Sequence, residues 1–168
     1  FVGKTASCLV NPMACHETEF EEATKFLPHE DRLRLGVIGA GPAGIAFACS
    51  AAERGHTVVL YEQSHKVGGQ FHMAKKVPGK EEFYEAIRYW EDRLEELSSD
   101  KGLPGSVEVK LNTEMTAEDM AKLSTNKDDG IDRWIVSTGV TPRDPGIPGS
   151  ENFSGRILSY IDVLKHNK

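Results

Sequence analysis

The chain contains few cysteines and no long hydrophobic run, and each scarcity excludes a class of protein. Its three cysteines, Cys8, Cys15 and Cys49, do not form the paired framework of a small secreted domain, so we expect a reducing compartment. No apolar run approaches the length of a membrane-spanning helix, and Phe1–Lys4 lacks the pattern of a signal peptide. The sequence therefore predicts a cytoplasmic or organellar protein that makes no contact with a membrane.

Basic residues are also in the minority. The chain has 20 Lys and Arg against 26 Asp and Glu, for a net charge of −6, and it has no basic cluster. This balance argues against a nucleic-acid-binding surface, which needs Lys and Arg to neutralise phosphates. The order of Ser, His, Asp and Cys residues predicts no activated nucleophile, so no catalytic residue is assigned. At 168 residues the chain has the length of one ordinary domain.

What the chain does contain is a strand–turn–helix–strand unit that ends in an acid. The short apolar run Leu33–Ile38 predicts a strand. A glycine turn follows and leads into an alanine-rich helix over Ile45–Arg54, and His56–Tyr61 predicts a second strand that ends at Glu62. The turn consists of Gly39, Ala40, Gly41, Pro42, Ala43 and Gly44. This order is typical of a dinucleotide-binding βαβ unit.

Each part of this unit has a mechanical task when a dinucleotide binds. Gly39 permits the tight turn, Gly41 lets the backbone approach a pyrophosphate, and Gly44 lets the helix pack closely on the strand. The helix N-terminus offers unpaired N–H groups to the phosphates. Glu62 can accept hydrogen bonds from both hydroxyls of an adenosine ribose, whereas a 2′-phosphate there would meet like charge. A glycine-rich turn in some other α/β protein is the alternative, but the complete frame favours a dinucleotide that is not NADP.

Beyond this unit, helices and strands continue to alternate. Residues 1–30 look irregular, apart from a short acidic helix predicted over Glu17–Phe26. Gln63–Lys80 is predicted to be a long loop, and loops of that length are usually functional or mobile. The remaining predicted elements are an amphipathic helix Glu81–Leu97, a strand Val107–Leu111, a helix Thr116–Leu123 capped by Thr116, a buried strand Arg133–Ser137, an extended segment Thr141–Gly149, and a short strand or helix Leu158–Lys165.

The alternation predicts an α/β fold: a three-layer, Rossmann-like FAD/NAD(P)-binding domain with a parallel sheet. Ligands of such sheets bind outside the carboxyl ends of the strands. The glycine turn, Glu62 and Thr138-Gly139 all follow predicted strands, so we expect them to converge on one crevice. The residues alone leave NAD and FAD open, because both present ADP to the glycine turn.

A resemblance favours FAD. The turn Gly39–Gly44, Glu62, Gly68-Gly69, and Thr138–Pro142 with Ile147–Gly149 are together similar to the FAD domains of flavoprotein reductases that carry two dinucleotide-binding domains. In that group the glycine pair passes close to the pyrophosphate or the flavin, and the strand-end Thr138 and Gly139 lie beside the cofactor. Judged without the glycine turn, Gly68-Gly69 could also be a simple turn.

The resemblance narrows to one family. The segments that carry it are Cys8–Glu17, Gly69–Phe71, Ala74-Lys75, Pro78–Tyr84 and Leu158–Leu164. They resemble the NADPH-dependent 2,4-dienoyl-CoA reductase family, in which an Old-Yellow-type flavoenzyme is fused to a reductase module. The similarity covers nearly the whole chain and weakens around residues 97–105 and 122–132. Met13 stands where the family leads us to expect a basic residue.

This resemblance implies a multi-centre enzyme. Family members carry FMN in a (β/α)₈ barrel, one 4Fe–4S cluster, FAD and an NADPH domain, and they pass electrons from NADPH to a 2,4-dienoyl-CoA in unsaturated fatty acid β-oxidation. Residues 1–30 would be the linker from the cluster, with Cys8 as one cluster ligand. Residues 31–168 would be a truncated FAD domain. The partners would be the missing barrel and NADPH domain of the same polypeptide, and we expect the isolated chain to be inactive.

Three further residues are candidate cofactor contacts because of their positions in the sequence. Two alternative hypotheses for the parent enzyme also remain. Gln63 and Gln70 flank the predicted cofactor contacts, and Met115 follows the third strand, where a backbone clamp on adenine is common. The first alternative parent is a related NADH-dependent enone reductase or amine dehydrogenase. The second is a free-standing ADP- or FAD-binding module without catalysis.

Overall fold

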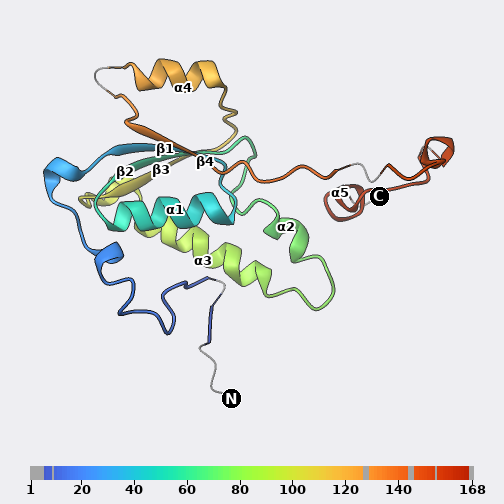
Figure 1. Cartoon of the computed structure of the whole chain (residues 1–168), viewed down its shortest axis with the longest axis horizontal. Helices are drawn as coiled ribbons and strands as arrows, with labels where there is room; N and C mark the ends of the chain where they lie inside the picture. Colours follow the sequence, from blue (N-terminus) through green and yellow to red (C-terminus); the bar gives the residue numbers. More distant parts are fainter. Residues whose placement is uncertain (1–5, 9, 127–128, 144–145, 154, 167–168) are drawn as a thin grey trace.

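The computed structural model describes residues 6–8, 10–126, 129–143, 146–153 and 155–166. Its centre is a four-stranded sheet in the order β3-β2-β1-β4, with every pair of neighbours parallel (Figure 1). The strands are β1 (Arg34–Ile38), β2 (Thr57–Tyr61), β3 (Ser106–Lys110) and β4 (Arg133–Val136). The predicted α/β fold with a parallel sheet is confirmed.

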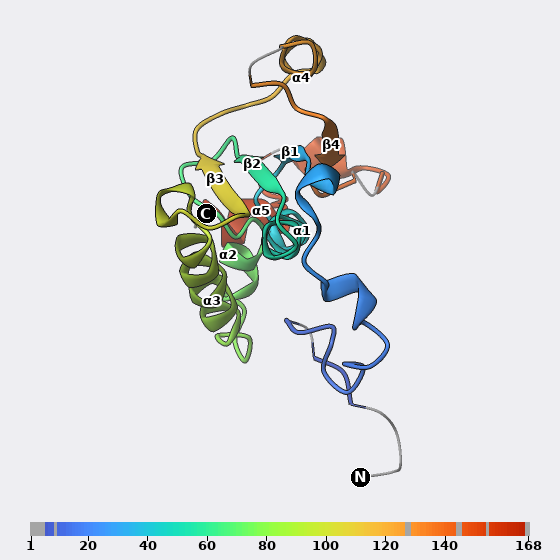
Figure 2. The same cartoon turned by 90° about the vertical axis from the view of Figure 1, so that its left-hand side faces the viewer.

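Helices cover both faces of this sheet. Figures 1 and 2 show α1 and α3 on one face and α4 on the other, which makes three layers. The helices are α1 (Pro42–Glu53), α2 (Phe71–Ala74), α3 (Phe83–Glu96), α4 (Ala117–Ser124) and α5 (Tyr160–Leu164), with short 3₁₀ turns at Glu22–Thr24, His29–Asp31, Ser99–Lys101 and Ser150–Phe153. None of the helices in the described ranges is long and apolar enough to cross a membrane.

The larger part of the core lies between the sheet and the α1–α3 layer. Val37 and Val58 from the sheet and Ile45 from α1 are fully buried there. The opposite face holds a smaller apolar cluster of Val59, Tyr61 and Ile131, which Trp134 and α4 help to cover. Because both faces are covered, the two central strands are apolar almost without a break, as in other parallel sheets.

Two helices follow their sequence patterns closely. The stripe on α3 buries Ile87, Trp90 and Leu94, and Trp90 and Leu94 pack into the core between α1 and the sheet. Thr116 caps α4 as predicted: its hydroxyl accepts the Asp119 N–H at 3.2 Å, and the Asp119 carboxylate accepts the Thr116 N–H at 3.1 Å. This reciprocal pair satisfies two N–H groups that would otherwise lack partners.

The structure corrects three sequence-based predictions. The acidic helix predicted over Glu17–Phe26 is wrong, since only the 3₁₀ turn Glu22–Thr24 forms. Phe20 and Phe26 are 38% and 50% exposed, so the short segment has no apolar partner that could stabilise it as a helix. The long loop Gln63–Lys80 contains the short helix α2.

The third correction concerns β4, which was predicted to be buried. Its residues are half-buried or exposed, and Val136 is 64% exposed. β4 pairs only with β1 and forms an edge of the described sheet, which explains the exposure. After β4 the chain extends away from the sheet (Figure 1). The segment Leu158–Lys165, predicted to be a strand or a helix, contains the helix α5.

Candidate dinucleotide site

The carboxyl ends of three adjacent strands form the candidate site. The Gly39 N–H donates to the Tyr61 carbonyl at 2.8 Å, which joins the glycine turn to the end of β2. The Ser137 N–H donates to the Ile38 carbonyl, also at 2.8 Å, which joins the end of β4 to the end of β1. The predicted convergence of the glycine turn, the acid after β2 and the segment after β4 is therefore present.

Two glycines of the turn are packed so tightly that no side chain fits. Gly39 has a φ of +99°, and a Cβ there would lie 2.5 Å from the Ser137 carbonyl oxygen. A Cβ on Gly44 would lie 1.9 Å from the carbonyl oxygen of Gly39. Both contacts are with backbone atoms: Gly44 lets α1 approach the turn after β1, and Gly39 lets this turn approach the chain after β4.

Gly41 has the opposite environment. No atom lies within 4 Å of the position that a Cβ on Gly41 would take. Gly41 is the N-cap of α1 and has no side chain to bond the first turn, and Pro42 occupies the first helical position. The N–H groups of Ala43 and Gly44 therefore have no partner within the helix, and they give this end of α1 a positive potential. The arrangement suits a phosphate group.

Glu62 is buried beside the turn and already holds two backbone groups. Its side chain is only 9% exposed, and its Oε2 accepts the Ala40 N–H at 2.8 Å. Its Oε1 accepts the Ser64 N–H at 2.8 Å. Each carboxylate oxygen keeps a second lone pair, so both can still accept a ribose hydroxyl. Glu62 thus stabilises the glycine turn, a function that the sequence pattern did not indicate.

The glycine pair after β2 lies against the glycine turn. The Gly68 N–H donates to the Ala40 carbonyl at 2.8 Å. Gly69 has a φ of +51°, and a Cβ there would lie 3.0 Å from the Cα of Gly41. The structure therefore brings Gly68 and Gly69 to the same edge of the sheet as Gly41.

The remaining predicted site residues differ in their exposure and in their contacts with the glycine turn. Thr138 and Gly139 are exposed after β4, and Gly139 has a φ of +78° with open space around it. The Gln70 amide donates to the Val140 carbonyl at 3.4 Å, which links the glycine pair to the segment after β4. Gln63 is exposed next to Glu62. Met115 is half-buried, and its side chain packs on the apolar cluster under α4.

Ser137 is a site residue that sequence reasoning missed. Its hydroxyl lies 2.9 Å from the Ile38 carbonyl oxygen and 3.0 Å from the Gly39 carbonyl oxygen. One hydroxyl hydrogen is shared between these two acceptors, and it fixes the start of the turn to the end of β4. The available signal was a serine directly after a strand and next to Thr138-Gly139.

The described cysteines do not form a metal site. Cys8 is exposed, and the N–H groups of Asn11 and Val10 lower the pKa of its thiol. Cys49 is buried in α1, and burial raises the pKa of its thiol to about 11. Within the described part of the chain, no three His, Cys, Asp or Glu residues are arranged to hold a metal ion. An iron–sulfur cluster therefore does not fit these residues by themselves.

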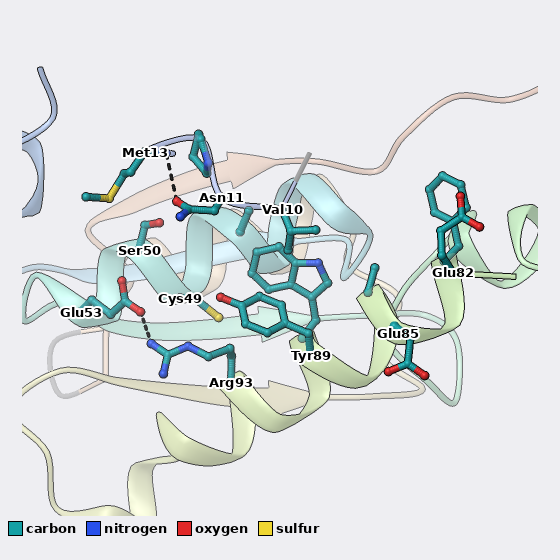
Figure 3. A pocket seen from close by; sticks show the side chains of 15 residues that line it. Val10, Asn11, Met13, Cys49, Ser50, Glu53, Glu82, Glu85, Tyr89 and Arg93 are labelled. Carbon is teal, nitrogen blue, oxygen red and sulfur yellow. Dashed lines mark hydrogen bonds and ion pairs between the residues drawn. The ribbon is translucent and has the colours of Figure 1, made fainter. Parts of the chain in front are cut away.

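A separate cavity lies between α1, α3 and the segment Val10–Met13 (Figure 3). Its volume is about 720 Å³, and Tyr89 and Trp90 contribute aromatic walls. The figure shows Arg93 paired with Glu53 at its edge. None of the residues predicted to bind the dinucleotide lines this cavity.

The comparison with known families identifies the fold and the general chemistry. Residues 33–167 match the family described as pyridine nucleotide-disulphide oxidoreductase. The chain belongs to this family. The matched range includes the predicted dinucleotide contacts from Gly39 to Gly139. This oxidoreductase domain therefore has the Rossmann-like FAD/NAD(P)-binding fold, and it forms part of an oxidoreductase.

Individual relatives extend the similarity over almost the whole chain. The NADH oxidase of Thermoanaerobacter brockii is 37% identical over 157 residues, which are 94% of this chain and 22% of that protein. The metal reductase of Desulforamulus reducens is 34% identical over 96% of this chain and 22% of its own length. A solved 2-naphthoyl-CoA reductase, in complex with 2-naphthoyl-CoA, superposes with a TM-score of 0.76 at 31% identity, over 96% of this chain and 22% of its own. This oxidoreductase domain thus spans about a fifth of the length of these relatives.

Proposed function

We propose that this chain is the FAD-binding part of a multi-centre flavin oxidoreductase. The observation that carries the proposal is the open space that a Cβ on Gly41 would enter, at an uncapped helix N-terminus whose N-cap residue is also approached by Gly69. A side chain at Gly41 would be tolerated by the fold, so glycine there serves a ligand rather than the packing. A pyrophosphate is the ligand that this combination of backbone N–H groups and positive potential recognises.

The residues present fit FAD, and each has a defined task. The amides of Ala43 and Gly44 would bind the pyrophosphate, and Gly69 would let the backbone pass close to it. Glu62 would bind the adenosine ribose through its free lone pairs, and its charge would repel a 2′-phosphate. Thr138 and Gly139, together with the backbone of Met115, would contact the rest of the cofactor. FAD, when bound, supplies a ring system that can accept a hydride and release electrons.

The finer proposal concerns the whole enzyme. We propose NADPH as the electron source, a 4Fe–4S cluster and FMN as further carriers, and a 2,4-dienoyl-CoA as the substrate. Similarity to 2-naphthoyl-CoA reductase supports a conjugated CoA thioester as the substrate class. Cys8 would be one cluster ligand and would need thiolates from outside the described residues. The barrel and the NADPH domain would be the partners of residues 31–168.

One observation favours an alternative electron donor. The relative that is 37% identical is named an NADH oxidase, which supports NADH in place of NADPH. An NADH-dependent enone reductase or amine dehydrogenase would use the same FAD site. The three relatives described above are all named for redox activities, which weighs against a non-catalytic ADP- or FAD-binding module.

The test is a titration of the purified chain with FAD, NADH and NADPH, followed by flavin fluorescence and calorimetry. We expect saturable binding of FAD and no measurable binding of NADPH, because Glu62 opposes the 2′-phosphate. NADH is the control that shares the ADP group. Tighter binding of NADH than of FAD would overturn the proposal and assign the site to the nicotinamide cofactor.

A further inference from the structure

The imidazole of His72, in α2, lies next to Gly68, the first residue of the glycine pair. Its Nε2 is 2.7 Å from the Val67 carbonyl oxygen. A Cβ on Gly68 would lie 3.1 Å from Nε2 and 3.2 Å from the Cγ1 atom of Ile87. Ile87 is 3% exposed and belongs to the core-facing stripe of α3. The imidazole and the side chain of Ile87 therefore pack against the same side of Gly68.

The hydrogen bond fixes the tautomer of the ring. A carbonyl oxygen only accepts hydrogen bonds, so Nε2 must carry the hydrogen that it donates to Val67. In the neutral ring Nδ1 then holds a lone pair, and this atom is buried without a hydrogen-bond partner in the described structure. A proton added at Nδ1 would place a charged N–H group where nothing accepts it, which is costly.

The segment that packs against His72 and Ile87 is the one that meets the glycine turn. Gly68 donates to the Ala40 carbonyl at 2.8 Å, and Gly69 approaches Gly41 so closely that a Cβ would lie 3.0 Å from its Cα. The His72 N–H also donates to the Gly69 carbonyl, at 3.3 Å. His72 thus holds the residues before and within the glycine pair from two sides, through its ring and its backbone.

We propose that His72, as the neutral Nε2–H tautomer, is a positioning residue that holds Gly68-Gly69 in the geometry required for the pyrophosphate. This inference rests on the proposed FAD site and adds a residue that touches neither the turn nor the cofactor. Without the imidazole, the Val67 carbonyl loses its hydrogen-bond donor, and Gly68 keeps only the packing contact with Ile87. The glycine pair then has more conformations to lose when the cofactor binds, which weakens binding.

The same geometry predicts a pH dependence. Burial lowers the pKa of His72 from its ordinary value of 6.5; Lys66 and Lys75 lower it further, whereas the bond to Val67 and the charge of Glu91 raise it. A group whose pKa is lowered in the ordered loop stabilises that loop above its ordinary pKa, and the loop loses this stability as the pH falls. FAD affinity should therefore decline below pH 6.5 through His72 protonation.

The test uses three variants of the chain and FAD as the probe. His72→Ala removes both the hydrogen-bond donor to Val67 and the packing contact with Gly68. His72→Gln places an amide N–H close to the position of Nε2. His72→Asn places the amide N–H near the position of Nδ1, out of reach of Val67. We expect His72→Ala and His72→Asn to bind FAD about five- to tenfold more weakly, the effect of one buried hydrogen bond. His72→Gln should bind within about twofold of the wild type and lose the decline below pH 6.5. His65→Gln, an exposed change in the same loop, is the matched control.

Hydrogen exchange at the Gly68 amide gives a second readout that does not require FAD. We expect faster exchange in His72→Ala and His72→Asn than in His72→Gln, while exchange in the core of β1 stays unchanged. Equal exchange rates and equal FAD affinities in all variants would overturn the proposal for His72. If the wild type binds no FAD, the proposed function fails, and the exchange rates alone still decide whether His72 positions the glycine pair.

Discussion

The glycine turn has a packed inner side and an open outer side, and glycine is required for a different reason on each. On the inner side, Gly39 and Gly44 are surrounded by backbone atoms, with a Cβ on Gly44 only 1.9 Å from a carbonyl oxygen. On the outer side, Gly41 faces open space for at least 4 Å. The inner glycines are therefore required for folding, whereas the outer one is available to a ligand. One motif thus contains two separable requirements, and substitutions can distinguish them.

Glu62 contributes both to the packing of the turn and to the proposed ligand site. Its carboxylate holds the Ala40 N–H inside the turn, while its remaining lone pairs point to a role in ribose binding. A carboxylate that is 9% exposed and accepts two backbone N–H groups stabilises the turn before any cofactor arrives. The site is consequently preorganised by the same residue that we propose binds the ribose.

The largest effect is expected from Gly44→Ala on the inner side. The new methyl group would overlap the Gly39 carbonyl, and relief requires α1 to move away from β1. We expect a loss of about 3 kcal/mol in the free energy of unfolding, at the upper end for overpacking. Urea unfolding followed by circular dichroism measures it. A stability equal to that of the wild type would contradict the packing described for the inner side.

A smaller effect is expected from Glu62→Gln, which acts on both sides. The amide keeps one acceptor oxygen but turns an NH₂ group toward either the Ala40 or the Ser64 N–H. We expect a loss of about 1–2 kcal/mol in stability, together with weaker FAD binding. Unfolding and FAD titration are measured on the same preparation. His65→Gln, an exposed change three positions further along the chain, is the control and should change neither quantity.

The smallest effect concerns His56, at the opposite end of the strands. Its Nδ1 accepts the Leu33 N–H at 3.0 Å, and burial, followed by the charge of Arg54, lowers its pKa from 6.5. Stability should therefore fall as the pH drops below that value, because protonation removes the acceptor. His56→Asn keeps an acceptor that does not titrate, so the decline should be smaller. Unfolding midpoints measured from pH 8 to about pH 5 test this, and equal slopes in the two proteins would refute it.

The sequence predicted the βαβ unit well because its signals are local. Strand, turn, helix and acid follow one another within residues 33–62, and each signal depends on its neighbours in the chain. The capping role of Thr116 was predictable for the same reason, since its partner Asp119 lies three residues later. The helix expected over Glu17–Phe26 failed because helical spacing needs an apolar surface to pack on, and none covers Phe20 or Phe26.

The contacts that brace the site depend on residues far apart in the chain. Ser137 reaches the Gly39 carbonyl across 98 positions, and Glu62 reaches Ala40 across 22. No local pattern encodes such pairs, so the sequence indicated the candidate residues but not how they hold one another. The exposure of β4 was also unpredictable, because it depends on the strand order rather than on the composition of Arg133–Val136.

The most direct test of the account is the FAD affinity of Gly41→Ala measured beside its unfolding free energy. The account predicts that stability stays within about 0.5 kcal/mol of the wild type, because the methyl group enters open space. It also predicts that FAD binding is lost or weakened at least about a hundredfold, because the methyl group occupies the approach of the pyrophosphate. Unchanged FAD affinity in a stable Gly41→Ala protein would contradict the assignment of this turn to the cofactor.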